Sequence, residues 1–425
     1  MTGAEYIAAF LEKRNCRNVF LVTGGACAFI VDAISRNAYL NYFPMQHEQS
    51  AAMAADALWK IDRTVGVTVA TSGPGATNLI TGIACSYFDS IPTMHITGQV
   101  NQKEKIPFKG TNVRQAGFQE TNIVDIVKPI TKYSIQVRNT EELKKELANA
   151  YSIATTDRMG PVLIDVPMDV QQLEMDDDIF LQEVKLKKAD IEACKKTISE
   201  FFSGSKRPLV LLGAGPGLSD QAEQVIDWLR LNSLSFVTSW NGMCFINSRD
   251  ANYYGNIGVY GNRGSNFILQ SCDKLLVLGS RLDNRQRGDN VDKFAPSAEV
   301  LVLDVDLSEL KKHSNESRYI TQQFNFRFSE QLFSSFKLNF SEDISAIRNN
   351  KAEGIILVTN VPEGVVALDE IAKQELTKLP IISHWGIASG QFASALANPI
   401  GMYNISVLQT FHFSHQKNSQ SKQLL

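Results

Sequence analysis

Residues 65–86 read VGVTVATSGPGATNLITGIACS, and this stretch decides the fold. Val65 to Thr71 is an apolar run with the length of a buried strand, Gly73-Pro74-Gly75 is a turn, and Thr77 to Ser86 has the composition of a helix. An apolar strand that leads through a tight turn into a helix is typical of a parallel sheet covered by helices on both faces. The stretch therefore predicts an α/β protein.

The same alternation of strand and helix extends outward and defines an N-terminal domain of residues 1–170. Near the start of the chain, Thr2 and Glu5 form a capping-box pattern that begins a helix, and the strand that follows ends in Gly24-Gly25. The other expected elements are strands at 19–22, 92–98 and 161–166 and helices at 29–35, 47–59 and from Thr140.

Two polar stretches divide the rest of the chain. Residues 170–190 contain three consecutive aspartates followed by lysines, as expected of a solvated linker, and residues 340–352 are expected to form a second linker. A central α/β domain is therefore expected at 188–340 and an incomplete third domain at 360–425. The expected elements are strands at 208–212, 274–278, 299–304 and 380–383 and helices at 189–202, from Ser219, and at 362–376.

The composition excludes several classes of protein. The chain has 425 residues with 42 basic and 45 acidic side chains, so its formal net charge of −3 gives no basic field to attract nucleic acid or an anionic membrane. No apolar run reaches the roughly 20 residues that cross a bilayer, and the N-terminus lacks the features of a secretory signal. The six cysteines have no C-x-x-C spacing, which predicts reduced thiols in a cytoplasmic protein.

Three features of the N-terminal domain are candidates for a ligand site. Thr23-Gly24-Gly25 follows a strand, where glycines let a ligand approach the backbone, and the alternative is a plain turn. Glu48 lies between an apolar strand and an Ala-rich helix, where a poorly hydrated carboxylate suits proton exchange with a base. The alternative for Glu48 is a helix N-terminal carboxylate that satisfies free N–H groups. Thr71 to Asn78 places backbone N–H groups at a helix start, where they can meet a polar ligand.

The central domain has two weaker candidates. Gly213-Ala214-Gly215-Pro216-Gly217 lies between a strand and a helix, which is compatible with phosphate binding or with a simple turn. Gly279 to Arg287 contains three arginines after a strand, which is compatible with a phosphate or carboxylate site or with a solvated loop. The histidines show no metal-binding spacing, so no metal ligand is predicted.

Taken together, these segments resemble the acetolactate synthase family of thiamine-diphosphate enzymes. The resemblance implies three α/β domains, namely a pyrimidine-binding (PYR) domain, a central domain and a diphosphate-binding domain. Because the active site of this family lies between the first domain of one subunit and the third domain of another, it also implies a homodimer or homotetramer. The matching segments are VTGGA (22–26), HEQSAA (47–52), TSGPGATN (71–78), DSIP (89–92), ITGQV (96–100), FQE (118–120), GPVLIDVP (160–167) and GSR (279–281).

The resemblance assigns roles to individual residues. Glu48 matches the catalytic glutamate that bonds N1′ of the aminopyrimidine, and Phe118 and Gln119 match positions on the substrate side. Arg281 matches a stretch that contacts FAD in some members. The implied cofactors are thiamine diphosphate, Mg²⁺ and, in some members, FAD. The residues that match the family's cofactor-binding positions in the first domain are Thr23, Gly24, Gly25, Thr71, Pro74 and Asn78.

The implied activity is decarboxylation of a 2-keto acid with carboligation. Two departures from the acetolactate synthases of branched-chain amino acid biosynthesis stand out, because those enzymes usually have proline at Thr23 and lysine at Met168. Other segments, such as Ser239-Trp240-Asn241-Gly242, are more similar to members associated with polysaccharide biosynthesis.

One family motif is absent. The third domain of the family holds Mg²⁺ and the diphosphate with Gly-Asp-Gly and a later Asn, and this sequence has no Gly-Asp-Gly. The resemblance fades after Asn404-Ile405-Ser406, so we expect a truncated family member. Two alternatives remain open: a non-catalytic partner of a full-length paralogue or an inactive remnant, and a protein that binds FAD or another nucleotide through its central domain only.

Overall fold

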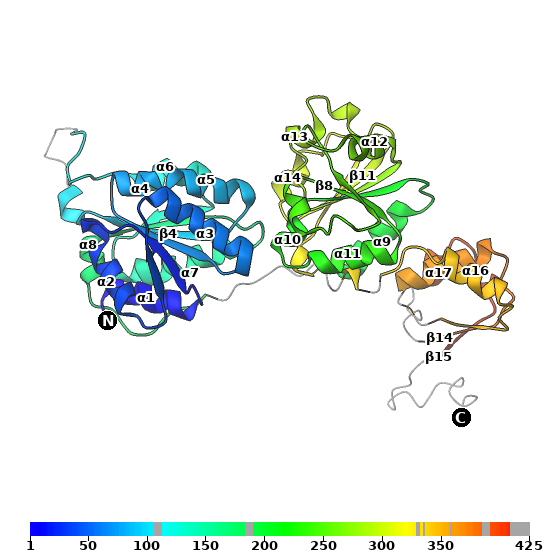
Figure 1. Cartoon of the computed structure of the whole chain (residues 1–425). Coiled ribbons are helices and arrows are strands. Elements are labelled where there is room, and N and C mark those ends of the chain that lie inside the picture. The colour runs from blue at the N-terminus through cyan, green and yellow to red at the C-terminus, as the bar shows by residue number, and fades with distance from the viewer. Residues whose placement is uncertain are drawn as a thin grey trace, which may run out of the picture. The chain divides into compact units, whose positions relative to one another are not determined.

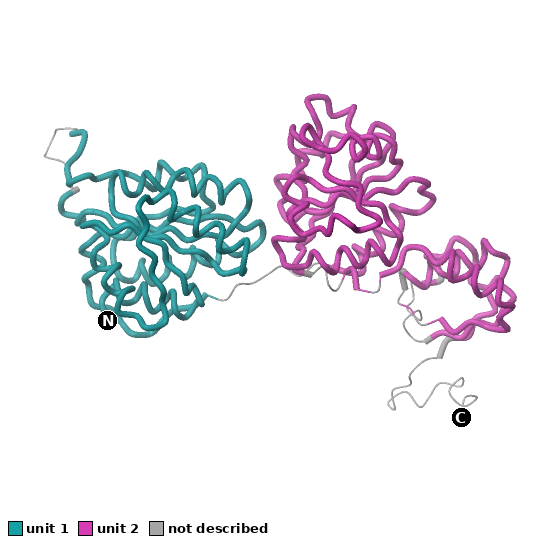
Figure 2. Tube along the Cα trace, in the orientation of Figure 1, with its two compact units in different colours: residues 1–187 teal, residues 188–425 magenta. Residues whose placement is uncertain are grey.

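The computed structural model divides into two compact units, residues 1–187 and 188–425, which are described separately here (Figure 2). The polar tail from Gln416 and the lysines expected in the first linker at 185, 187 and 188 lie outside the described residues. The described residues are 1–105, 113–182, 190–328, 332–334, 336–357, 359, 361–384 and 392–408.

The first unit is built on a six-stranded parallel sheet with the order β2-β1-β3-β4-β6-β5. The chain crosses from β1 to β2 on one side and continues from β3 on the other side. The carboxyl edge of β1 and β3 is therefore a topological switch point, the place where open α/β sheets bind ligands. The strands are β1 (Asn18–Leu21), β2 (Asn41–Pro44), β3 (Gly66–Ala70), β4 (Thr93–Gln99), β5 (Tyr133–Gln136) and β6 (Val162–Pro167).

Helices cover both faces of this sheet (Figure 1). The helices α1, α2, α7 and α8 contact one another on one face, and α3, α4 and α5 do so on the other. The helices are α1 (Gly3–Lys13), α2 (Ala28–Arg36), α3 (Glu48–Asp62), α4 (Pro74–Asn78), α5 (Ile80–Asp89), α6 (Ile123–Val127), α7 (Thr140–Thr155) and α8 (Met168–Gln172).

Small residues fix the Ala-rich helix α3 close to its neighbours. Ala52 and Ala55 are fully buried. A Cβ atom on Gly82 would lie 2.3 Å from the Cβ of Ala52, and one on Gly66 would lie 2.3 Å from the carbonyl oxygen of Ala55. Since only glycine permits this spacing, the position of α3, and with it of Glu48 at its first residue, is set by backbone contact.

The second unit begins with another six-stranded parallel sheet of order β12-β11-β10-β7-β8-β9. Successive residues of β7 enter opposite cores, because Val210 and Leu212 pack with α9 and α11, whereas Leu209 and Leu211 pack with α12 and α14. The strands are β7 (Pro208–Leu212), β8 (Ser235–Thr238), β9 (Tyr253–Asn256), β10 (Lys274–Leu278), β11 (Glu299–Asp304) and β12 (Tyr319–Gln323). The helices are α9 (Ile191–Phe202), α10 (Gly215–Leu218), α11 (Ala222–Leu231), α12 (Arg263–Ser271), α13 (Asn284–Arg287) and α14 (Leu307–Lys311).

A three-stranded parallel sheet of order β13-β14-β15 follows in the same unit. The expected linker at 340–352 was wrong, because Ser341–Asn349 forms the helix α16. Its Ile344 is buried against Leu368 and Ile381, so the apolar spacing of a mostly polar segment, rather than its composition, decides its structure. The remaining elements are β13 (Ile355–Leu357), α17 (Val361–Lys373), β14 (Ile381–His384), α18 (Phe392–Ala395) and β15 (Ile405–Leu408).

The predicted α/β class with parallel sheets and flanking helices is confirmed. The capping box of Thr2 and Glu5 is also present at the start of α1. The helix expected from Thr77 begins earlier, at Pro74, and is divided at Leu79 into α4 and α5. All six cysteines are free. No helix among the described residues is long and apolar enough to cross a bilayer.

Candidate functional site

The loops after β1 and β3 meet at the switch point of the first sheet. The backbone N–H of Ala26 donates to Oγ1 of Thr71 at 3.2 Å, which ties the two loops together. A Cβ atom on Gly24 would lie 2.5 Å from the Cβ of Thr71. Gly24 is therefore required for the close approach of the two loops, and Thr71 is the side chain that joins them.

Two further glycines of these loops differ in what surrounds them. A Cβ atom on Gly25 would meet no atom within 4 Å. A Cβ atom on Gly75 would lie 3.2 Å from Oε1 of Glu48 and 2.8 Å from Cγ2 of Thr71. A larger residue at position 75 would therefore occupy the space beside the Glu48 carboxylate.

Glu48 is the buried carboxylate of this site. Glu48 is the first residue of α3. The preceding residue, His47, caps this helix, because its Nδ1 accepts a hydrogen bond of 3.1 Å from the backbone N–H of Gln49. Glu48 is only 8% exposed, and its Oε2 accepts a hydrogen bond of 2.9 Å from Nδ2 of Asn78. The amide orients one oxygen and leaves the other beside Gly75. A carboxylate held in this way can accept or share a proton with a nitrogen base in the adjoining space.

The predicted substrate residues lie on the segment 113–122, and the structure brings one of them to the turn after β3. Gly73 and Gln119 both have positive φ values, 65° and 54°. A Cβ atom on Gly73 would lie 2.8 Å from the Cβ and the carbonyl oxygen of Gln119, so the two backbones are in contact. Phe118 is 78% exposed and points into solvent.

The remaining predicted residues of the first domain lie at the rim. Pro74 is the first residue of α4 and is exposed. Thr23 is also exposed, two residues beyond the end of β1. The structure thus places Gly24, Thr71, Glu48 and Asn78 in one connected group.

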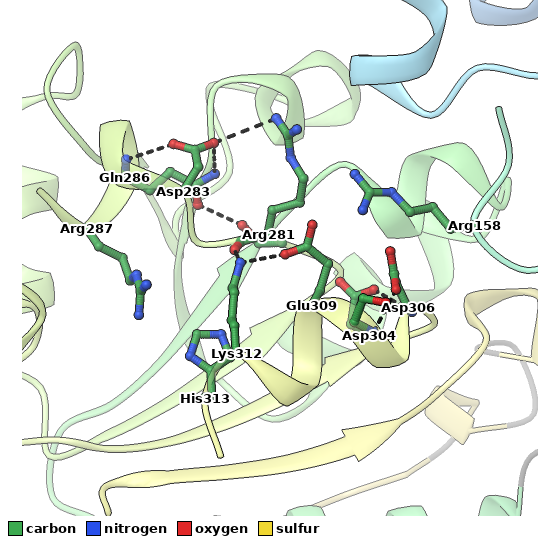
Figure 3. Close-up of polar contacts among 12 residues, drawn as sticks. Arg158, Arg281, Asp283, Gln286, Arg287, Asp304, Asp306, Glu309, Lys312 and His313 are labelled. Atoms are coloured by element: carbon green, nitrogen blue, oxygen red, sulfur yellow. Dashed lines mark hydrogen bonds and ion pairs between the residues drawn. The ribbon is translucent and has the colours of Figure 1, made fainter. Parts of the chain in front are cut away.

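Arg281 belongs to the second unit and lines an open pocket of about 500 Å³ (Figure 3). The pocket is formed mainly by the loop after β10 and by Lys312. Its cations are partly neutralised, because Arg281 lies 3.7 Å from Asp283 and Arg287 lies 3.1 Å from Glu316. Lys312 donates to the carbonyl oxygen of Arg281 and lies 2.5 Å from Glu309.

The Gly-rich turn after β7 has a structural explanation. A Cβ atom on Gly213 would lie 2.0 Å from the carbonyl oxygen of Gly279, and one on Gly215 would lie 2.8 Å from the Cα of Gly279. These glycines allow the turns after β7 and β10 to pack on each other. The geometry supports the simple turn among the two alternatives for residues 213–217.

A polar cluster that sequence reasoning missed lies at the ends of β4 and β6. Asp165 is 1% exposed and accepts hydrogen bonds from Thr97 and Gln99. The available signal was polar side chains inside strands that are otherwise apolar. A second missed feature is the pairing of Glu48 with Asn78, which no spacing rule predicts.

The predicted cofactors fit this arrangement to different degrees. The buried carboxylate of Glu48, oriented by Asn78, fits the aminopyrimidine of thiamine diphosphate in its chemistry, because a carboxylate can share a proton with a ring nitrogen. The described residues contain no group of three or more His, Cys, Asp or Glu side chains that could hold a metal ion.

Two family models match the chain. The model of the N-terminal TPP-binding domain of thiamine pyrophosphate enzymes matches residues 1–126, and the model of their central domain matches residues 196–323. The first match contains Glu48 and Asn78, and the second contains Arg281.

The chain is also similar to several acetolactate synthase large subunits. The isozyme 2 large subunit of Escherichia coli (strain K12) is 33% identical, and the match covers 73% of this chain and 55% of the relative. A probable large subunit of Methanocaldococcus jannaschii is 34% identical over 74% of this chain and 52% of the relative. The large subunit of Corynebacterium glutamicum is 35% identical over 73% and 49%. The chain thus spans about half the length of the curated relatives it matches.

Proposed function

This chain belongs to the thiamine pyrophosphate enzymes and is related to acetolactate synthase large subunits, and from that premise we propose that it binds thiamine diphosphate and acts in the decarboxylation and carboligation of a 2-keto acid. The observation that carries the proposal is the Glu48 carboxylate, which is buried, oriented by Asn78 and adjacent to Gly75. This is the arrangement that a proton exchange with the aminopyrimidine requires.

Each residue of the group has a part in this function. Thiamine diphosphate, when bound, supplies a carbon nucleophile and an electron sink for decarboxylation. Glu48 shares a proton with N1′ of the aminopyrimidine, and Asn78 keeps the carboxylate in position through its bond to Oε2. Gly25 leaves open space at this edge of the sheet, and Gly75 lets α4 approach Thr71 and the Glu48 carboxylate. Phe118 and Gln119 are proposed to contact the keto acid.

The partners follow from the same premise. We propose a homodimer or homotetramer, as the family resemblance implies, or an assembly with a full-length paralogue. An identical subunit carries the same residues, so of these partners the paralogue is the one that would add metal ligands beyond those of the described residues.

A second candidate function is supported by the pocket beside Arg281. A phosphate-bearing cofactor such as FAD would meet four cationic side chains there, Arg281, Arg285, Arg287 and Lys312. The ring of Tyr260, whose centroid lies 5.7 Å from the Arg285 guanidinium carbon, would add an aromatic surface. Purification of a yellow protein, or saturable binding of added FAD that is lost in Arg281→Ala, tests this function. Colourless protein that does not bind FAD would exclude it.

The experiment for the main proposal is calorimetric titration of the full chain with thiamine diphosphate and Mg²⁺, followed by an assay of pyruvate consumption. Glu48→Gln keeps the shape of the side chain and removes its basicity, so we expect turnover to fall about 10²- to 10⁴-fold. Glu141→Gln is the matched control, because Glu141 is also a carboxylate in the first turn of a helix but lies on α7. We expect it to leave turnover unchanged.

The outcomes of these experiments distinguish a catalytic chain, a non-catalytic partner and an inactive protein. Turnover that survives in Glu48→Gln would contradict the assigned mechanism. Absence of cofactor binding by the chain alone, with binding restored by a full-length paralogue, would favour the non-catalytic partner. Absence of binding under both conditions would favour an inactive protein.

A further inference from the structure

A second buried carboxylate lies in the first domain, close to the site but outside it. Asp165 of β6 is register partner to Thr97 of β4 on one side and to Gln136 of β5 on the other, so the three side chains share one face of the sheet. Thr97 donates to Oδ1 of Asp165 at 2.7 Å, and Gln136 donates to Oδ2. Such a connected set of buried polar groups fixes the orientation of each member.

Gln99 connects this carboxylate to the segment 113–122. The side chain is 1% exposed, and its Nε2 donates to Oδ2 of Asp165 and to the carbonyl oxygen of Thr121, both at 3.0 Å. Its Oε1 accepts the backbone N–H of Val100 at 3.1 Å. Both polar atoms of the Gln99 side chain are thus hydrogen-bonded, and the bond to Thr121 holds the end of the segment 113–122.

The segment is tightly packed between this bond and the turn after β3. A Cβ atom on Gly117 would lie 2.7 Å from Cγ2 of Val100. The backbone N–H of Gly117 donates to Oε2 of Glu120 at 3.1 Å, which closes the segment on itself. Gln119 then contacts Gly73 with its backbone. A shift at Thr121 would therefore move the residues that precede it.

The chain that leaves β4 is held by a second carboxylate, Asp169, which follows β6. Oδ2 of Asp169 accepts Nε2 of Gln102 at 3.1 Å, and the same Nε2 donates to the carbonyl oxygen of Arg138 at 2.9 Å. The chain that leaves β4 is thus attached to Asp169 after β6, and the chain that returns to α6 is attached to Gln99 of β4 and through it to Asp165 of β6.

We propose that Gln99, held by the buried carboxylate of Asp165, is a positioning residue that fixes the segment 113–122 and thereby places Gln119 against the cofactor turn at Gly73. This inference rests on the proposed function, which gives Phe118 and Gln119 the substrate side. Gln99 itself is buried and acts through Thr121 rather than by contact with the substrate.

The test compares two variants of the full chain that remove different donors from the same carboxylate. Gln99→Met loses the bond to Thr121, whereas Gln136→Met removes a donor to Asp165 but leaves the segment attached. Hydrogen–deuterium exchange of residues 117–121 is expected to accelerate about tenfold in Gln99→Met and to stay unchanged in Gln136→Met. Equal exchange in both variants would overturn the proposal. Gln99→Asn, which keeps an amide but is one methylene shorter, replaces Gln99→Met if that variant does not fold.

A second readout separates positioning from a merely structural role. In Gln99→Met we expect the KM for pyruvate to rise about tenfold while the Kd for thiamine diphosphate changes less than about twofold. Loss of cofactor affinity in parallel with the rise in KM would contradict positioning and indicate general weakening of the domain. The exchange experiment needs no turnover, so it decides the attachment of the segment even if the proposed function fails.

Discussion

The two large sheets of this protein use glycine-rich turns at their carboxyl edges in opposite ways. In the first sheet, a Cβ atom on Gly25 would meet no atom within 4 Å, and the buried carboxylate of Glu48 lies at the same edge. In the second, Gly213 and Gly279 press against each other, and a Cβ atom on Gly213 would lie 2.0 Å from a backbone oxygen. The two turns are alike in composition, but a Cβ atom on Gly25 of the first would meet no protein atom, whereas one on Gly213 of the second would meet backbone.

The difference shows what a glycine motif means in an α/β fold. A glycine at a switch point is evidence of a ligand only when no protein atom occupies the position of its missing side chain. By this criterion, Gly25 is the glycine that borders open space. Gly75 and Gly213 have packing explanations, and Gly24 serves the approach of one loop to Thr71.

The largest expected effect comes from adding a methyl group to each kind of glycine. Gly213→Ala forces a Cβ atom onto the backbone of Gly279, so we expect the free energy of unfolding to fall by about 3 kcal/mol or more. Gly25→Ala, the matched change at an open position, should alter it by less than about 0.5 kcal/mol. Urea unfolding followed by circular dichroism measures both. Similar losses would remove the distinction between the two turns.

A smaller effect on stability, combined with a loss of binding, is expected at Gly75. The added Cβ would lie 2.8 Å from Cγ2 of Thr71 and 3.2 Å from Oε1 of Glu48. We expect Gly75→Ala to cost about 1 kcal/mol of stability and to weaken thiamine diphosphate at least about tenfold. Calorimetry and thermal unfolding separate the two effects. Gly264→Ala, at an open position in α12, serves as the control. Unchanged affinity of Gly75→Ala for thiamine diphosphate would contradict binding of the cofactor beside Glu48.

Acid should weaken the first sheet through His95. Burial lowers the pKa of His95 to about 3, and its ring lies between the hydroxyls of Thr68 and Thr93 at 2.7 and 2.9 Å. The unfolded chain takes up a proton below about pH 6.5 whereas the folded chain does not, so this contribution to stability is complete above pH 6.5 and is lost as the pH falls toward 3.

We expect the loss to be about 1 kcal/mol between pH 6.5 and 5.5, and His95→Gln to abolish it. His313 of the second unit is the control. Burial also lowers its pKa, but its bond to Glu316 opposes that effect, so His313→Gln should change the pH dependence less. The measurement is the free energy of unfolding against pH. A larger change in His313→Gln would reverse the comparison.

The smallest expected effect is a difference in the labelling rates of exposed and buried cysteines, with no change in the fold. Cys85 in the first unit and Cys244 in the second are exposed, so both should react rapidly with a thiol reagent at pH 8. Burial raises the pKa of Cys27 to about 11 and that of Cys16, Cys194 and Cys272 to about 12, which should protect these thiols. Rapid labelling of Cys27, which lies beside Gly24, would show that the glycine loop of the first unit opens.

Much of the fold could be predicted from the sequence. The stretch 65–86 predicted strand, turn and helix because buried parallel strands are continuously apolar and their turns require glycine. One edge strand of the first sheet, β5, escaped prediction, whereas the apolar strand expected before Glu48 is the other edge strand, β2. Tyr133–Gln136 in β5 is only partly buried and has no apolar run, because it is paired on one side only. The helix α16 escaped because its composition is polar and only Ile344 is buried.

The site was predicted as residues but not as contacts. Glu48 and Asn78 were both candidates, yet their hydrogen bond depends on how α3 and α4 are packed by alanine and glycine, which no single segment reveals. Gln99 and Asp165 were missed as a pair because they come together only when β4 and β6 become neighbours. Such contacts follow from the packing of helices and the order of strands, which local sequence does not show.

That order of strands has a consequence for synthesis on the ribosome. β6 is the last strand of the first sheet to be translated, but it lies between β4 and β5. Until Val162–Pro167 has emerged, β5 has no partner and the apolar edge of β4 stays open. The insertion of β6 then completes the sheet and at the same time places Asp165 beside Gln99. Completion of this domain and attachment of the segment 113–122 are therefore expected to occur together, late in the synthesis of the domain.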